Sequence, residues 1–442
     1  MGYTKEDIID LVMENDVKFI RLQFTDLFGS LKNVAVTASQ LGKVLHNECM
    51  LDGSSIEGFL RIEESDMYLR PDLDTFVIFP WRPQHGKVAR FLCDVYTTDG
   101  KPFAPSPRQV LRQVTQRAAR MGYTLQVGPE CEFFLFQTDE QGRPTAIPHD
   151  RAGYFDLSPV DLGENARREI CLTLEEMGFE IESSHHESAP GQNEVDFHYQ
   201  NALQAADSIQ TLKLVVKTVA QRNGLAASFM PKPLNGINGS GMHINLSLEK
   251  EGKNVFYDPA GPLGLSKTAY HFLGGIFAHV RGMTLLTNPL VNSYKRLCSG
   301  YEAPRYLAWS LANRSHLVRV PKSKPENTRL ELRSPDPACN PYLAFAALLE
   351  AGLAGMEEEI WPPQPVDGNI FALTQQERQK LGIGALPLDL GEAIDAFLAD
   401  PLMQQVLGKE LSEKYVAAKQ HEWDTYRTAV TDWEWNRYFG VY

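Results

Sequence analysis

The spacing of apolar and polar residues predicts an α+β unit in the first hundred residues of the chain. Lys5 to Glu14 has the periodicity of an amphipathic helix. Strand-like runs rich in Val, Phe and Ile follow it, at residues 17–24, 34–36, 75–81 and 88–95. One helix and several short strands in so few residues predict a small, compact sheet.

A turn-rich segment follows this unit. Residues 97–107 read TTDGKPFAPSP, and Ser106 followed by Pro107 is typical of a helix N-cap with proline at the first helical position. We therefore predict two domains, 1–103 and 104–442. Helix-like stretches in the second domain alternate with short strands, which predicts an α+β domain built around a sheet. These stretches are 107–121, 202–223, 267–286 and 341–356.

The C-terminal tail predicts a helix from Leu411 onward and is rich in aromatic residues. These residues are Trp423, Tyr426, Trp433, Trp435, Tyr438, Phe439 and Tyr442. Such aromatic density is costly to leave in water. We expect the tail to dock either on its own core or on another subunit.

Composition narrows the class of protein. The 442 residues are 43% hydrophobic, which excludes a disordered chain, and the net charge of −13 argues against nucleic acid or an anionic membrane as a partner. No run reaches the roughly 20 apolar residues of a membrane-spanning helix, and the first 21 residues carry charges where a signal peptide is apolar. Six scattered cysteines without a CxxC pair predict reduced thiols. We expect a cytoplasmic protein.

Acidic residues two positions apart in apolar runs are the main chemical signal. Glu130 and Glu132 project from one face of a predicted strand at 127–136, where two like charges repel each other. Similar faces are formed by Glu194, Asp196 and His198, by His243, Asn245 and Ser247, and by Arg329, Glu331 and Arg333. Any one run fits an amphipathic strand in water. Four together predict a site for divalent cations that prefer oxygen ligands, Mg²⁺ or Mn²⁺.

Arginines cluster in a chain that is acidic overall. Six of them lie within forty residues: Arg296, Arg305, Arg314, Arg319, Arg329 and Arg333. Surface ion pairs with nearby glutamates are one interpretation. Guanidinium groups also bind carboxylates and phosphates bidentately, so arginines beside divalent cations favour phosphoryl transfer involving an anionic substrate. The usual phosphate-loop, dinucleotide and kinase motifs are missing from the sequence.

These residues fall in motifs through which the chain resembles glutamine synthetases of the bacterial type I class. The motifs are DGSSI at 52–56, GPECEF at 128–133, HHE at 185–187, GQNE at 191–194, NGSGMH at 238–243, NSYKR at 292–296, 313–321 and RLELR at 329–333. The resemblance implies condensation of glutamate with ammonia, driven by ATP through γ-glutamyl phosphate. It also implies a β-grasp N-terminal domain and a catalytic domain whose antiparallel sheet forms a metal-lined funnel.

The resemblance also assigns roles to residues. It implies two or more metal ions per subunit, one held by Glu132, Glu187 and Glu194 and one by Glu130, His243 and Glu331. Glutamate would bind Asn238, Gly239, Arg296, Glu302, Arg314 and Arg333. ATP would bind Glu182, Tyr199, Asn245, Ser247, Arg314, Arg319 and Arg329.

Three residues are assigned catalytic roles by the same resemblance. Asp52, contributed by the neighbouring subunit, would attract ammonium and accept its proton. Glu302 would lie on a flap that shields the acyl phosphate from water. Arg314 would contact both substrates.

Assembly and regulation follow from the resemblance as further expectations. It implies a homo-dodecamer of two stacked hexamers, with the aromatic tail crossing to the opposite ring. Residues 369–374 read NIFALT, without the tyrosine that the longer subtype adenylylates, so we expect the shorter subtype that glutamine inhibits. Arg61 would take part in that inhibition, or else be a plain surface residue. A transcriptional regulator or a small inhibitory protein is a further expected partner.

Two other functions remain open at this point. One is a ligase that joins glutamate to an amine larger than ammonia, such as a polyamine or methylamine. The presence of Asp52 and Ser54 favours ammonia, because a larger amine needs a reshaped pocket. The other is a non-catalytic structural or regulatory relative, which the complete set of expected metal ligands argues against.

Overall fold

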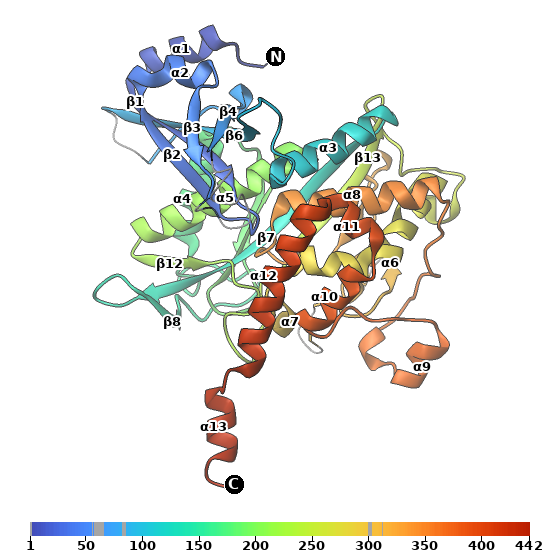
Figure 1. The fold of residues 1–442 in the computed structure, drawn as a ribbon. Coiled ribbons are helices and arrows are strands. Elements are labelled where there is room, and N and C mark those ends of the chain that lie inside the picture. Colours follow the sequence, from blue (N-terminus) through green and yellow to red (C-terminus); the bar gives the residue numbers. More distant parts are fainter. Residues whose placement is uncertain (1, 55, 57–65, 82–84, 299–302, 312) are drawn as a thin grey trace.

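The computed structural model describes residues 2–54, 56, 66–81, 85–298, 303–311 and 313–442. They form two sheets, a smaller one near the N-terminus and a larger one that runs through the rest of the chain (Figure 1). Helices coloured yellow to red pack beside the larger sheet, and the C-terminus extends away from the body (Figure 1). The predicted α+β class is confirmed.

The smaller sheet has six strands in the order β2-β1-β6-β4-β3, with β5 paired to β6. Its elements are α1 (Lys5–Glu14), β1 (Val17–Thr25), β2 (Leu31–Thr37), α2 (Leu41–Leu45), β3 (Cys49–Asp52), β4 (Asp66–Pro71), β5 (Val77–Ile78) and β6 (Lys87–Thr97). Helix α1 begins where predicted, because Thr4 and Asp7 form a reciprocal capping box. The predicted strand at 75–81 is wrong in part, since a 3₁₀ turn at Leu73–Thr75 leaves a two-residue strand.

The larger sheet is built on β7 (Thr124–Thr138), which pairs with five other strands. The remaining strands are β8 (Pro144–Pro148), β9 (Ile181–His186), β10 (Gln192–Phe197), β11 (Gln200–Asn201), β12 (Leu225–Ser228), β13 (Met242–Lys250), β14 (Lys253–Asn254), β15 (Trp309–Ser310), β16 (Val318–Arg319) and β17 (Leu330–Leu332). The pairing is antiparallel except between β15 and β16.

Helices α3 (Pro107–Arg120), α4 (Glu164–Glu176) and α5 (Ala202–Arg222) pack against this sheet, over the buried apolar residues that alternate with the predicted acidic ones along β7. The other helices of the second part of the chain are α6 (Lys267–Thr287), α7 (Val291–Arg296), α8 (Pro341–Glu357), α9 (Gln375–Lys380), α10 (Leu390–Leu398), α11 (Pro401–Leu407), α12 (Lys409–Thr428) and α13 (Asp432–Tyr438). Ser106 occupies the predicted N-cap of α3, but its side chain makes no capping hydrogen bond with the described residues. Proline at the first helical position marks this helix start.

Two hydrophobic cores correspond broadly to the two sheets. The smaller core contains side chains from Ile8 to Phe103, whereas the larger one begins in the N-terminal part with Leu27, Phe79 and Val88. One side of the smaller sheet therefore packs against the rest of the chain. The domain boundary between residues 103 and 104 remains a prediction.

The C-terminal tail leaves the body in this single chain. Helix α12 packs through Leu411 and Tyr415, whereas α13 projects outward (Figure 1). Trp433 is 66% exposed and Phe439 is 68% exposed. Docking of the tail on its own core is therefore wrong for α13. No helix in the described part of the chain has the length and apolar character needed to cross a membrane.

Helices α6 and α8 approach each other through glycines. A Cβ atom on Gly275 would lie 2.0 Å from the carbonyl oxygen of Ala351, which no rotation of a side chain can relieve. Gly355 faces it from α8, where a Cβ atom would lie 2.3 Å from the oxygen of His271. The backbones can pack this closely because both positions lack a side chain.

We predict that Gly275→Ala lowers the melting temperature by several degrees, because the two helices must separate. Thermal unfolding followed by circular dichroism measures this effect. Gly42→Ala is the control, since a Cβ atom at that helical position meets no described atom within 4 Å and alanine favours a helix. Equal melting temperatures for the wild type and Gly275→Ala would contradict the packing account.

Candidate active site

The register of the large sheet brings acidic side chains together. Across the ladder between β7 and β10, Glu132 lies opposite Glu194 and Glu130 lies opposite Asp196. Like charges in directly opposed positions destabilise a sheet. On the other side of β7, His243 of β13 is the partner of Glu130. The period-two pattern of the sequence thus becomes two rows of polar groups across neighbouring strands.

Two more strands extend these rows. His185 of β9 is the register partner of Glu194. On the opposite side of the sheet, Glu331 of β17 pairs with Asn245 of β13 and with Arg319 of β16. The site therefore combines residues that are far apart in the sequence, and the register of the sheet places them side by side.

Two cavities adjoin on this face and share Glu130 and Asp196. The first has a volume of about 430 Å³, and five of the residues predicted to bind ATP line it: Glu182, Tyr199, Asn245, Ser247 and Arg329. The second has a volume of about 480 Å³ and contains the six predicted metal ligands together with Asn238, Gly239, Arg296, Arg314, Arg319 and Arg333. Arg319, predicted to bind ATP, lines the second cavity, and so does Arg314, predicted to contact both substrates.

The predicted set Glu130, His243 and Glu331 converges tightly. Their ligand atoms lie within 4.8 Å of one another. His243 Nδ1 lies 3.2 Å from Glu130 Oε2, and Arg319 Nη1 donates to Glu331 Oε2 at 2.9 Å. Two carboxylates and an imidazole are ligands that suit Mg²⁺ or Mn²⁺, and the set contains no thiolate of the kind that favours zinc.

In the second predicted set, Glu132, Glu187 and Glu194, two of the three carboxylates flank a histidine. His185 Nδ1 lies 3.7 Å from Glu187 Oε1, and His185 Nε2 lies 3.6 Å from Glu194 Oε2. A tight convergence of ligand atoms is formed instead by His185, Glu194 and Asp196. Three carboxylates around one wall of the cavity still fit an oxygen-binding cation.

The acidic groups of the site have well-separated pKa values. Burial, followed by the charge of Glu187, raises the pKa of Glu132 to about 8. Burial also raises the pKa of Asp196 to about 6 and that of Glu194 well above its ordinary value. Burial acts on Glu130 too, but the hydrogen bond and charge of His243 outweigh it and hold the pKa at about 2. Without a bound cation, the raised pKa values keep some of these carboxyl groups protonated, which reduces the repulsion between them.

A buried pair of residues, Asp150 and His186, holds the turn that carries Glu187 through hydrogen bonds. His186 is fully buried, with Nε2 2.9 Å from Asp150 Oδ1 and Nδ1 2.7 Å from the carbonyl oxygen of Glu187. Asp150 Oδ1 also accepts the backbone N–H of Gly191 at 2.9 Å. Gly191 has φ +71° and its Cβ position lies 2.7 Å from the oxygen of Leu135, so this turn requires glycine.

Arginines and a close backbone approach form the remaining walls of the second cavity. Arg296 is buried and donates to the carbonyl oxygens of Ser334, Pro335 and Arg333. Arg333 Nη1 is bonded to Glu331. The Cβ position of Gly239 lies 2.1 Å from the oxygen of Pro231, so a side chain there would displace the loop.

Asp52 is not among the described residues that line the two cavities of this chain. It ends β3 in the smaller sheet, where Oδ1 accepts hydrogen bonds from the backbone and hydroxyl of Ser54. Arg61 and Glu302 lie outside the described residues.

Sequence reasoning assigned no individual role to several residues of the site. His185 lay in the HHE motif, and the two-residue spacing of the acids placed Asp196 on the same face as Glu194 without naming it as a ligand. Gln192 donates to Glu132 Oε2 at 2.7 Å, and its place in GQNE was a weaker signal. Tyr154 lines the second cavity and carries no local pattern that could have identified it.

Comparison with known proteins agrees with this geometry. Residues 16–98 match the family model "Glutamine synthetase, beta-Grasp domain", and residues 104–438 match "Glutamine synthetase, catalytic domain". A β-grasp domain followed by a sheet with carboxylates, imidazole and guanidinium groups defines the class of ATP-dependent ligases that activate a carboxylate.

Relatives of known function identify the family within this class. A glutamine synthetase of Clostridium saccharobutylicum is 62% identical over 440 residues, covering 100% of this chain and 99% of the relative. One of Staphylococcus aureus strain Mu50 is 55% identical, with the same coverage. The chain belongs to the glutamine synthetase family. It catalyses the ATP-dependent ligation of ammonia to glutamate, which gives glutamine.

Solved structures share the fold over nearly the whole chain. A GmaS complex with ADP has a TM-score of 0.89 and 35% identity, covering 98% of this chain and 100% of that one. A cryo-EM structure of Plasmodium falciparum glutamine synthetase has a TM-score of 0.87 and 25% identity, covering 99% of each chain. The predicted β-grasp and catalytic folds are confirmed.

We predict that Glu132→Gln stabilises the metal-free protein increasingly as pH rises from 5 to 8. Between pH 5 and 8, a carboxyl whose pKa is raised to about 8 stays protonated in the folded state but ionises in the unfolded chain. The wild type therefore loses up to about 1.4 kcal/mol of stability per pH unit, a loss that glutamine at this position avoids. Thermal unfolding in a chelator at several pH values measures the effect. Glu413→Gln, at an exposed position of α12, is the control, and a pH-independent gain for Glu132→Gln would contradict the prediction.

Proposed function

We propose that the protein makes glutamine through γ-glutamyl phosphate, with the nucleotide in the 430 Å³ cavity and glutamate in the 480 Å³ cavity. The observation that carries this proposal is that the two cavities meet at Glu130 and Asp196. A phosphoryl group could then move from one to the other without crossing solvent. Water would otherwise compete with ammonia for the acyl phosphate.

Two divalent cations, Mg²⁺ or Mn²⁺, fit the shared wall. We assign one to Glu130, His243 and Glu331 and the other to Glu132, Glu187 and Glu194, with His185 and Asp196 adjacent. When bound, such cations neutralise charge on transferring phosphates and on the attacking carboxylate. The buried pair formed by Asp150 and His186 would keep Glu187 in place when the carboxyl groups of the site ionise.

Glutamate recognition is assigned to the guanidinium and backbone groups of the second cavity. Arg333 and Arg314 would neutralise the substrate carboxylates, and Asn238 and Gly239 would bind its polar backbone groups. Arg296 adds a buried positive charge behind them. Glu182, Tyr199, Asn245, Ser247 and Arg329 would hold the nucleotide, with Arg319 reaching its phosphates.

Asp52 and Glu302 complete the proposal. Because Asp52 belongs to the smaller sheet, we assign it to the cavity of a neighbouring subunit, where its carboxylate would attract ammonium and accept a proton. Glu302 is assigned to the cover of the acyl phosphate on the strength of the resemblance to the family.

Assembly is proposed on the same basis. The exposed aromatic residues of α13 suit a segment that packs against another subunit, which supports a dodecamer of two stacked hexamers. Inhibition by glutamine through Arg61, a regulatory protein partner, and a cytoplasmic location are further proposals. A ligase for a larger amine is the second candidate, since the GmaS structures are similar, yet Asp52 and Ser54 in DGSSI favour ammonia.

The test compares amines with the purified protein, ATP, glutamate and Mg²⁺. We predict rapid phosphate release and glutamine formation with ammonium, and little turnover with methylamine or putrescine, with products identified by mass spectrometry. Omission of glutamate is the control for uncoupled ATP hydrolysis. Turnover with the larger amines in place of ammonium would contradict the proposal.

A further inference from the structure

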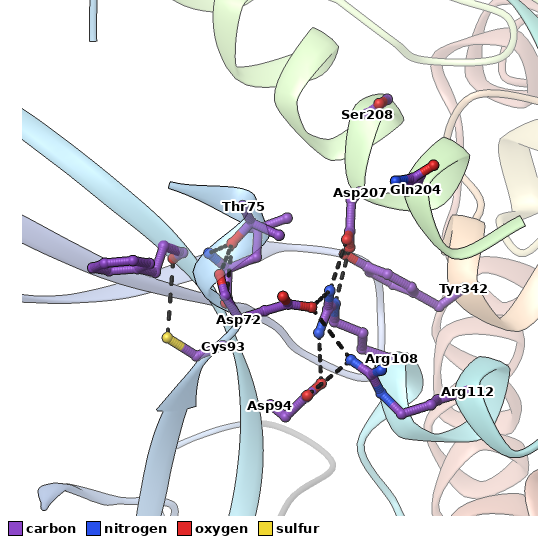
Figure 2. A network of polar contacts seen from close by, with 12 residues as sticks. Asp72, Thr75, Cys93, Asp94, Arg108, Arg112, Gln204, Asp207, Ser208 and Tyr342 are labelled. Atoms are coloured by element: carbon purple, nitrogen blue, oxygen red, sulfur yellow. Dashed lines mark hydrogen bonds and ion pairs between the residues drawn. The ribbon is translucent and has the colours of Figure 1, made fainter. Parts of the chain in front are cut away.

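Arg108 joins the two sheets of the molecule. Its guanidinium binds Asp207 of α5 with two hydrogen bonds, of 3.0 Å from Nε and 2.8 Å from Nη2. Nη2 also donates to Asp72 at 2.7 Å, and Nη1 donates to Asp94 at 2.7 Å (Figure 2). Asp94 belongs to β6 and Asp72 follows β4, so both acids belong to the smaller sheet. The Arg108 side chain is only 5% exposed, so solvent screens these contacts weakly.

Other groups complete this network. Arg112, one turn further along α3, donates to Asp94 at 2.9 Å and to Asp72 at 3.4 Å. Tyr342 of α8 donates its hydroxyl to Asp207 at 2.7 Å and so fixes that carboxylate from the other side (Figure 2). An arginine with partners on both sides of a junction fixes orientation as well as distance, because its fork is planar and rigid.

The network lies at one end of β4, and Asp52 lies at the other end. Asp66, the first residue of β4, is the register partner of Asp52, while Asp72 follows the last residue. Six residues of extended chain separate the two ends, a distance of about 20 Å. A small rotation of β4 at the Arg108 end therefore becomes a displacement of about an ångström or more at Asp52.

A second junction restrains the opposite edge of the same sheet. Asn340 donates to the carbonyl oxygens of Asp26 and Leu27, and Gln210 donates to that of Gly29. These contacts hold the loop between β1 and β2. The half of the sheet formed by β6, β4 and β3 is held by Arg108 and Arg112 and by a 2.9 Å hydrogen bond from Arg90 of β6 to Thr211 of α5. Loss of the Arg108 contacts would let the β4 and β3 side tilt, while the Arg90 and Asn340 contacts keep the domain attached.

We propose that Arg108 is a positioning residue for ammonia use: it fixes the smaller sheet so that Asp52 reaches the cavity of the neighbouring subunit. This inference rests on the role of Asp52 in the proposed function. The glutamate and nucleotide cavities belong to the larger sheet, so their ligands do not depend on the tilt. Displacing a catalytic group by about an ångström can cost roughly a hundredfold in rate.

The test measures each substrate separately in the full-length protein. We expect Arg108→Gln and the milder Asp94→Asn to raise the KM for ammonium about tenfold or more. The KM for glutamate and ATP, and glutamate-dependent phosphate release without ammonium, should change by less than about twofold. Asp94→Asn keeps the bonds from Arg108 to Asp72 and Asp207, so it serves if Arg108→Gln does not fold.

Arg117→Gln is the matched control. Arg117 lies on the same helix and forms ion pairs with Glu350 and Glu357, but both partners belong to α8. This variant should leave the KM for ammonium unchanged. A similar rise in Arg117→Gln, or an equal loss of the ammonium-independent step in Arg108→Gln and Asp94→Asn, would show general destabilisation and overturn the proposal.

An Asp52→Asn background separates this inference from the function on which it rests. If Arg108 acts through Asp52, Asp94→Asn should add no further loss of ammonium use in that background. Additive losses would overturn the positioning role. A normal KM for ammonium in Asp52→Asn would contradict the role of Asp52 and the inference with it. A raised KM in Asp52→Asn beside a normal KM in Asp94→Asn would contradict the inference alone.

Discussion

The crowding of carboxylates across the ladder between β7 and β10 is the constraint on which the site depends. Glu130 and Glu132 of β7 lie opposite Asp196 and Glu194 of β10. Strand β7 also pairs with four other strands of the large sheet, which is built around it. Their repulsion can be relieved by protons, by histidine and arginine, or by bound cations. The first two are visible in the raised pKa of Glu132 and in the contacts of His243 and Arg319, and the third is the basis of the proposed chemistry.

Local sequence patterns predict most of the fold. The period-two runs became β7, β10 and β13, and the capped segment at Lys5–Glu14 became α1 with the same bounds. The patterns failed where tertiary contacts decide the outcome, as at 75–81, where a turn shortens the strand. They also could not show that α6 and α8 pack closely at Gly275, because its neighbour Ala351 lies 76 positions further along the sequence.

The candidate site could be predicted in part for the same reason. Spacing placed Glu130 and Glu132 on one face, but which strand lies beside β7 depends on the register, so the opposition of Glu130 and Asp196 was not foreseeable. Tyr154 entered the cavity through the fold alone. The Arg108 network was invisible for a similar reason, because its acids come from segments up to 135 positions apart and each looks like an ordinary surface charge in the sequence.

The central claim is that the wall shared by the two cavities allows a phosphoryl group to pass from ATP to the carboxylate of glutamate. Its most direct test uses glutamate labelled with ¹⁸O in the γ-carboxylate, together with ATP and ammonium, and analyses the phosphate released. Transfer through γ-glutamyl phosphate predicts one labelled oxygen in each phosphate. Unlabelled phosphate, formed at the same rate as glutamine, would contradict the account.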